Sequence, residues 1–88
     1  MNTDFAKRFD NDVKKIIDII VTTAIEQAIL NVEEAPTMRD IARLRKLKGY
    51  RIYYRIKIGR YRIGTAIVGN LVTFLRCLPR KDFYKYFP

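Results

Sequence analysis

The chain has 88 residues and a net charge of +9, with 18 Lys and Arg, nine acids, one cysteine and no histidine. This length predicts one domain over residues 1–88 with a modest core. The composition excludes histidine-based catalysis and an internal disulfide, and it leaves too few ligands for a zinc site. With no leader and no membrane-spanning apolar run, we expect a cytoplasmic protein without a metal, a small-molecule cofactor or a membrane partner.

The first part of the chain has the pattern of a helical hairpin. Apolar residues recur at helical spacing from residue 4 to about 18, which predicts a first helix there. Thr23 and Glu26 have the spacing of a capping box and predict the start of a second helix. The β-branched residues between positions 18 and 22 are also compatible with one long helix, so both arrangements remain open at this point.

The hydrophobic period then changes from that of helices to that of strands. Thr37 and Asp40 are expected to cap a short third helix that runs to about residue 44. After Gly49 the period is 2, and two Gly-containing pairs have the form of tight turns. These signals predict strands at about residues 50–58, 61–68 and 71–77, connected by turns at Gly59-Arg60 and Gly69-Asn70. We therefore expect an α+β fold, with an antiparallel β-meander of three to four strands and the helical hairpin packed on one face.

Positive charge is concentrated in this second part of the chain. Residues 36–88 hold fourteen of the Lys and Arg residues but only two acids, a net charge of +12, whereas residues 1–35 carry −3. Alternation in the first strand puts Ile52, Tyr54, Ile56 and Ile58 on one face and Arg51, Tyr53, Arg55 and Lys57 on the other. A row of cations with an aromatic among them indicates a surface that binds a polyanion.

A two-residue turn at Gly59-Arg60 determines how the first two strands face each other. Lys57 then lies opposite Arg62, a pair of like charges that destabilises a sheet and is tolerated mainly at functional sites. Gly64 lies beside Arg55 and leaves a hollow where a ligand can approach the backbone. The same construction puts Arg76 on the core side, so either its side chain reaches out at the strand end or a bulge shifts the register.

Cations alone can support one reaction of RNA. The RNA's own 2′-hydroxyl attacks the adjacent phosphate and expels the 5′-oxygen, so the protein supplies no nucleophile and needs no metal. Lys57 lies among arginines that favour its neutral form, which suits a general base. Arg80 can stabilise the leaving oxygen and Tyr84 can stack on a base. A basic face is nevertheless more often a binding surface, so catalysis stays the minority interpretation from composition alone.

Several motifs in residues 47–88 resemble the RelE/ParE superfamily of type II toxin–antitoxin toxins, and most closely its RelE-like branch. They are Leu47-Lys48-Gly49, Tyr54-Arg55-Ile56-Lys57-Ile58-Gly59, Tyr61-Arg62-Ile63-Gly64, Phe74-Leu75-Arg76 and Arg80-Lys81-Asp82-Phe83-Tyr84. The resemblance implies a small sheet with two helices on one face. It also implies a ribosome-dependent mRNA endonuclease that acts in the ribosomal A site and is neutralised by a cognate antitoxin. The first strand of the family is expected to be mostly missing, because residues 1–4 leave little room for it.

The resemblance also implies a set of site residues. The catalytic candidates are Arg55, Lys57, Arg62, Arg80 and Tyr84, and the further RNA-binding candidates on the same surface are Lys48, Arg51, Tyr53, Arg60 and Lys81. Arg55 replaces a lysine of the best-known RelE, which makes Lys57 the better candidate for a base. Many relatives carry histidine where Pro79 stands. Two alternatives remain: a ParE-like inhibitor of DNA gyrase, and a basic RNA-binding module without activity, such as a decayed toxin.

Overall fold

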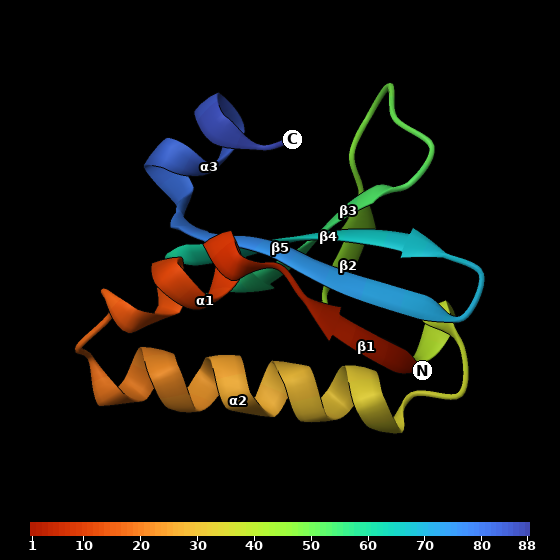
Figure 1. Ribbon diagram of the computed structural model, residues 1–88, viewed down its shortest axis with the longest axis horizontal. Helices are drawn as coiled ribbons and strands as arrows, with labels where there is room; N and C mark the ends of the chain where they lie inside the picture. The colour runs from red at the N-terminus through yellow and green to blue at the C-terminus, as the bar shows by residue number, and fades with distance from the viewer.

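One mixed sheet of five strands forms the centre of the computed structural model, which describes residues 1–88 (Figure 1). The strands are β1 (Asn2–Phe5), β2 (Leu44–Lys46), β3 (Tyr53–Ile58), β4 (Tyr61–Val68) and β5 (Leu71–Pro79). They lie in the order β1-β5-β4-β3-β2. All neighbours are antiparallel except β1, which pairs parallel with β5. The meander predicted from the two glycine turns is confirmed as β3, β4 and β5.

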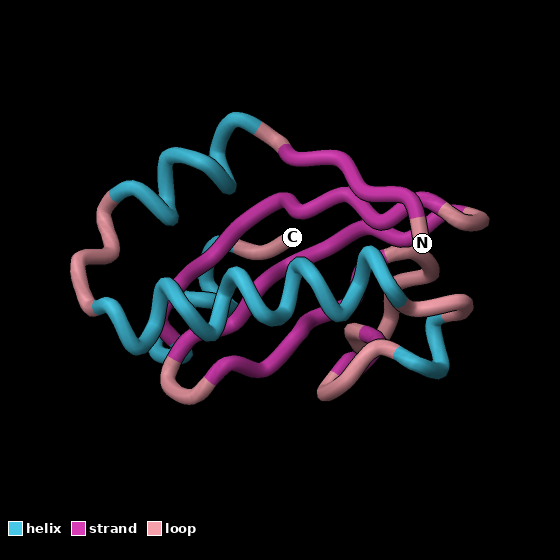
Figure 2. Tube along the Cα trace, turned by 90° about the horizontal axis from the view of Figure 1, so that it is seen from below, coloured by secondary structure: helices cyan, strands magenta, loops and turns pink.

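The helices cover the sheet unequally. They are α1 (Lys7–Lys14), α2 (Ile19–Glu34), a 3-10 helix (Met38–Asp40) and α3 (Arg80–Tyr86). The long helix α2 runs across one face of the sheet, whereas α3 rises on the other side together with the β2–β3 loop (Figures 1 and 2). The predicted α+β class with an N-terminal helical hairpin on one face is confirmed. None of these helices combines the length and apolar character that crossing a membrane requires.

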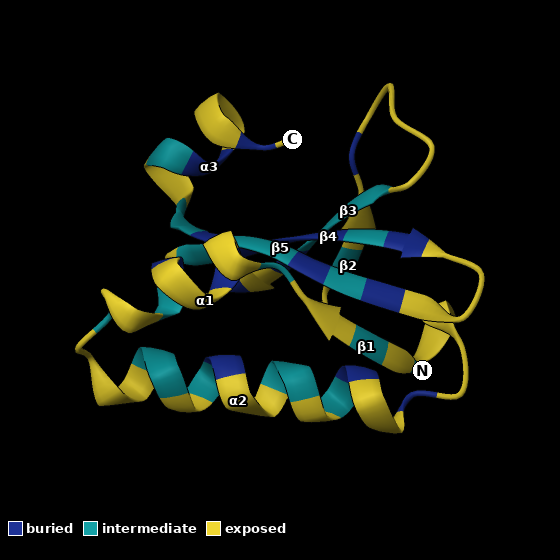
Figure 3. Ribbon diagram, in the orientation of Figure 1, coloured by how far each residue is buried: buried dark blue, intermediate teal, exposed yellow.

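The main core lies between the sheet and the helical hairpin. Twelve buried residues form it, including Phe9 of α1, Ile25 and Val32 of α2, and Ile63 and Phe74 of the sheet. Colouring by burial shows the side of α2 that faces the sheet as buried or half-buried and its outer side as exposed (Figure 3). A much smaller cluster of three buried residues, Leu47, Phe83 and Phe87, lies under α3. We call these two sets the main core and the tail cluster.

Two short strands at the sheet edges depart from the prediction. Residues 2–5 do form a first strand, β1, so the expectation that it would be mostly missing is wrong. Phe5 ends this strand and stacks on Phe74 with ring centroids 5.0 Å apart, instead of starting a helix. The three-residue β2 was also missed, and β3 begins at Tyr53 because residues 50–52 belong to the loop before it. Neither edge strand is long enough to show a period of 2 in sequence.

The helix boundaries also needed correction. The first helix is α1, which covers Lys7–Lys14 only, and the chain does break before α2, so one continuous helix is excluded. The second helix starts at Ile19 and not at Thr23, because the Asp18 carboxylate caps it by accepting a hydrogen bond from the Ile20 amide at 2.9 Å. The Thr37–Asp40 capping box is confirmed, but its helix ends at Asp40 and does not reach residue 44.

A bulge explains the position of Arg76. The register of β4 and β5 shifts between Gly64 and Thr65, so that Leu75 is an extra residue and Arg76 lies opposite Gly64. The guanidinium leaves the core side and donates from Nε to Asp12 of α1 at 2.8 Å and from Nη2 at 3.2 Å. The same carboxylate accepts the Cys77 amide at 2.9 Å, so it also ties the bulge to α1. Of the two alternatives left by the sequence, the bulge is correct.

Candidate nucleic-acid interface

Six of the predicted site residues line one open cavity of about 1040 Å³, which we call the cationic cleft. They are Lys57, Arg60, Arg62, Arg80, Lys81 and Tyr84. The cleft lies where the β3–β4 turn meets the end of β5 and the start of α3. The backbone itself joins these parts, because the Arg80 amide donates to the Arg60 carbonyl at 2.7 Å. Five positive charges from two separate parts of the chain thus surround one space, and no acid lines it.

The pairing of Lys57 opposite Arg62 is confirmed, but the two charges are not left simply repelling each other. Arg62 is only 6% exposed, and its Nη1 donates to the carbonyls of Gly59 at 2.8 Å and Tyr61 at 2.9 Å. These turn carbonyls offset part of the cost of placing two cations side by side. The remaining guanidinium nitrogens have no protein acceptor in the structure, so they are free to bind an anion in the cleft.

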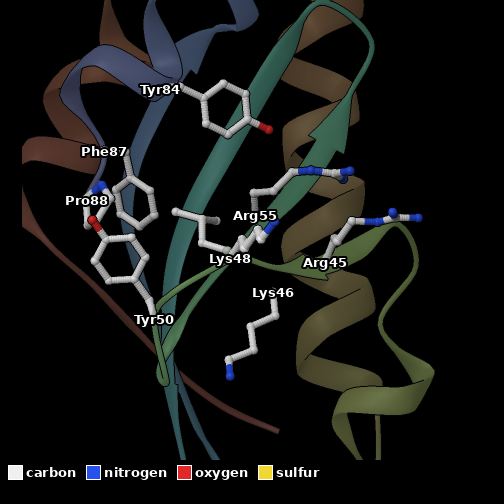
Figure 4. Close-up of a pocket in the computed structure, with 9 residues that line it drawn as sticks. Arg45, Lys46, Lys48, Tyr50, Arg55, Tyr84, Phe87 and Pro88 are labelled. Atoms are coloured by element: carbon white, nitrogen blue, oxygen red, sulfur yellow. The ribbon is translucent and has the colours of Figure 1, made fainter.

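Arg55 lies outside the cationic cleft, in a neighbouring cavity of about 370 Å³ that we call the loop pocket (Figure 4). The polar residues that line it are Arg45, Lys46, Lys48, Tyr50, Arg55 and Tyr84. Arg55 donates to the Arg43 carbonyl at 3.1 Å, which orients its side chain. Tyr84 lines both cavities and is 60% exposed, so one tyrosine stands between two cationic spaces.

Sequence reasoning missed Arg45, Lys46 and Tyr50 because β2 was not recognised as a strand. In the sheet Arg45 pairs directly with Arg55, a second pair of opposed cations on the same face as Lys57 and Arg62. The sequence did hold one signal for β2, which is the glycine of Lys48-Gly49-Tyr50 just before a predicted strand. Gly49 has a φ of +88°, a conformation that glycine adopts readily in turns. A turn that leads into a strand is often preceded by the strand's antiparallel partner.

Two expectations for this face are changed by the chain's last residues. The hollow predicted at Gly64 is not open to a ligand, because the Phe87 ring fills it and a Cβ there would lie 2.7 Å from that ring. Tyr53 packs edge-on against Phe87 and Tyr50, both at centroid distances of 5.6 Å, and lines neither cavity. Arg51 is exposed in the loop and also lines neither.

The cations of this surface have no acidic partners. The only ion pair in the structure joins Arg76 to Asp12, outside both cavities, and its hydrogen bonds raise the pKa of Arg76 above the usual value. Burial similarly raises the pKa of the Cys77 thiol to about 12, which keeps it neutral and unreactive. The structure contains no group of three or more acidic, histidine or cysteine side chains that could hold a metal ion. The face is therefore arranged to receive negative charge from another molecule.

Comparison with known proteins identifies the family. The protein-family model described as "ParE toxin of type II toxin-antitoxin system, parDE" matches residues 4–84 of this chain. Toxin RelE3 of Methanocaldococcus jannaschii is 38% identical over 89 residues, which cover 100% of both chains.

Solved structures agree with this match. The toxin in the RelB-RelE antitoxin-toxin complex from Methanococcus jannaschii superimposes with a TM-score of 0.80 at 36% identity, over 97% of this chain and 99% of that chain. The YoeB dimer from Staphylococcus aureus has a TM-score of 0.71 at 18% identity, over 89% and 94% of the two chains, and shows the fold alone. The resemblance found in residues 47–88 is confirmed. The chain belongs to the ParE toxin family of type II toxin–antitoxin systems and is a RelE-like toxin.

Proposed function

We propose that the protein cleaves mRNA on the ribosome and so inhibits translation. The observation that carries this proposal is the cationic cleft, where residues of two distant segments converge with no acid among them. Phosphoryl transfer within RNA needs mainly positioning and stabilisation of charge on the phosphorane, and a set of fixed cations provides both. In the proposed assignment the cleft receives the scissile phosphate.

In the proposed reaction the 2′-oxygen forms a bond to phosphorus while the bond from phosphorus to the 5′-oxygen breaks. The products are a 2′,3′-cyclic phosphate and a 5′-hydroxyl. Lys57, exposed on β3, takes the 2′-hydroxyl proton as general base, and Arg62 binds a non-bridging oxygen through the nitrogens that the turn leaves free. Arg80 stabilises the charge on the leaving 5′-oxygen, which takes a proton from solvent to become the hydroxyl, and Tyr84 stacks on a base.

The cleft is open and has no strong acid–base pair, so we expect free RNA to be cut poorly. A ribosome holds the message in a defined conformation in its A site and supplies the positioning that the cleft lacks. Ribosomes and mRNA are thus the proposed partners, and the cytoplasm the proposed place of action. Equal cleavage of free and ribosome-bound message would contradict this dependence.

The direct test uses purified protein and mRNA-programmed ribosomes. Lys57→Arg keeps the positive charge but cannot act as a base, because a guanidinium does not deprotonate. It should retain ribosome binding and lose cleavage by about a hundredfold or more, since general-base catalysis contributes about 10²–10⁴. Lys85→Ala is the control, because Lys85 is exposed on α3 but lines neither cavity. Full cleavage by Lys57→Arg would remove Lys57 from the role of base.

Inhibition of DNA gyrase is the alternative activity within the superfamily. The cleft favours RNA cleavage, because a gyrase inhibitor does not need this convergence of cations. A supercoiling assay decides between them: loss of gyrase activity at toxin concentrations that leave mRNA intact would support the alternative. A non-catalytic module would bind RNA but would neither cleave mRNA on ribosomes nor inhibit supercoiling by gyrase.

We further propose that a cognate antitoxin protein neutralises the toxin. A relative that is 36% identical is described in a complex with RelB, which supports this assignment. Residues 36–88 carry a net charge of +12, so an acidic antitoxin segment would be steered to them. The association rate should fall steeply as salt rises. A rate independent of salt would exclude charge steering.

A further inference from the structure

The loop pocket has a feature that cleavage in the cationic cleft does not require. Four cations line it: Arg45, Lys46, Lys48 and Arg55. None of them has an acidic partner, because the only ion pair of the structure lies elsewhere. Arg45 and Arg55 face each other directly across β2 and β3, where like charges destabilise a sheet. An anion bound between them would relieve this repulsion.

The pocket is also built to hold its shape. Arg43 has a φ of +60°, a conformation that costs a non-glycine residue energy. Its carbonyl accepts from the Arg55 guanidinium at 3.1 Å and from the Lys57 amide at 3.4 Å. Through this one oxygen the strained residue orients the Arg55 side chain and holds the β3 backbone at Lys57. The backbone positions of two β3 cations on the same face are thus tied to one point of the preceding loop.

Aromatic side chains complete the pocket. Tyr50 is 45% exposed at the rim, and Tyr84 is shared with the cationic cleft. In Figure 4 the Arg45 and Arg55 side chains extend to one side of the pocket, Tyr50 lies on the other side beside Phe87 and Pro88, and Lys48 lies between them. Cations that follow a backbone, together with rings on which bases stack, are the elements of single-stranded RNA sites.

We propose that the loop pocket is a second RNA subsite, which binds the nucleotide next to the scissile phosphate. The phosphate of that nucleotide lies between Arg45 and Arg55, and its base stacks on Tyr50. The RNA strand passes Tyr84 on its way from one cavity to the other. This inference rests on the proposed function for the identity of the strand, but its test measures binding and does not depend on cleavage.

The experiment measures binding of 2′-O-methyl RNA, which cannot be cleaved, in lengths from one to six nucleotides. The loop-pocket variant combines Arg45→Ala, Lys46→Ala and Lys48→Ala. The control combines Lys7→Ala, Lys14→Ala and Lys15→Ala at α1, which removes the same charge far from the pocket. We expect the wild type to gain affinity beyond the first nucleotide and the loop-pocket variant to lose that gain, with about tenfold weaker hexamer binding than the control. Its salt slope should fall by about 0.7 for each phosphate that the altered pocket no longer binds.

A second variant distinguishes loss of RNA binding from loss of folding. Lys48 lies in the loop outside every strand, so Lys48→Glu should melt like the wild type and still weaken hexamer binding more than Lys14→Glu does. If both loop variants bind the hexamer as their controls do, the subsite does not exist. If they bind it normally but sediment less with ribosomes, the pocket holds ribosomal RNA, and the proposal for the substrate strand is overturned.

Failure of the proposed function would look different. A wild-type protein that cuts no mRNA on ribosomes, while hexamer binding still depends on the loop pocket, would refute the nuclease and retain the subsite. Normal cleavage with no effect of the loop variants on RNA binding would refute the subsite and retain the nuclease.

Discussion

The two faces of the sheet are stabilised very differently. Under the helical hairpin lies the main core of twelve buried residues, whereas α3 is held by a tail cluster of three. The cations and the tyrosine of the proposed site all belong to the second face or its rim. The stable half of the molecule therefore carries little of the proposed site, and the half that carries the proposed site has little burial of its own.

This difference follows from the charges. Covering a cationic surface with apolar side chains carries a large desolvation cost. Only the C-terminal segment, with the aromatic residues Phe83 and Phe87 of the tail cluster, therefore packs on this face. Phe87 fits over Gly64 because that position has no side chain, and Phe83 and Leu47 complete the contact. Tyr84 lies between these anchors and owes its position to them. If the two regions are energetically separate, they should respond separately to mutation.

The largest effect is expected in the main core. Phe74 is fully buried and packs against Phe5 and Phe9, so Phe74→Ala should lower the free energy of unfolding by about 3–5 kcal/mol. Denaturant melts measure the loss. Cys77 gives a second readout, because it is buried in the same core and reacts with a thiol reagent only when the core opens. Its labelling should be much faster in Phe74→Ala than in the wild type.

A mutation of the tail cluster should affect function more than stability. Phe87→Ala should release α3 and lower mRNA cleavage by about tenfold, because Tyr84 loses its position. We expect the free energy of unfolding to change by less than about 1 kcal/mol and Cys77 labelling to stay as in the wild type, since the tail can open without the core. A loss of stability as large as that of Phe74→Ala would show that the two regions unfold as one unit.

Gly64→Ala tests the contact between the tail and the sheet. The added Cβ would lie 2.7 Å from the Phe87 ring, which must then move. Cleavage should fall by about threefold to tenfold in the wild-type background. In Phe87→Ala the same substitution should have almost no further effect, because neighbouring sites that share one contact are not additive. Equal effects in both backgrounds would mean that Gly64 acts through something other than the tail.

The smallest effect is expected at the strained edge of the sheet. Arg43→Gly should raise the free energy of unfolding by about 0.5 kcal/mol, because glycine adopts a φ of +60° without steric cost. Arg55 should keep its hydrogen bond, since the acceptor is a backbone carbonyl. Arg43→Ala removes the same charge but keeps the strain, so it is the matched control. Equal stability of the two variants would show that the strain costs little.

Much of this organisation was determined by the sequence alone. The glycine turns and the period of 2 predicted β3, β4 and their register, which is enough to put Lys57 opposite Arg62. Local signals suffice here, because a two-residue turn forces the pairing of the strands on either side. The same signals placed Arg80 and Tyr84 directly after the last strand, where the fold brings them to the cationic cleft.

Other features depended on contacts between distant parts of the chain. The position of Arg76 depends on Asp12, 64 residues earlier, and the first strand exists only because β5 offers it an edge. The hollow at Gly64 is closed by a ring from the chain's last turn, and the loop pocket requires β2, which has no period of its own. Three- and four-residue strands are stabilised by their neighbours and not by intrinsic preference, so only the tertiary structure decided where they form.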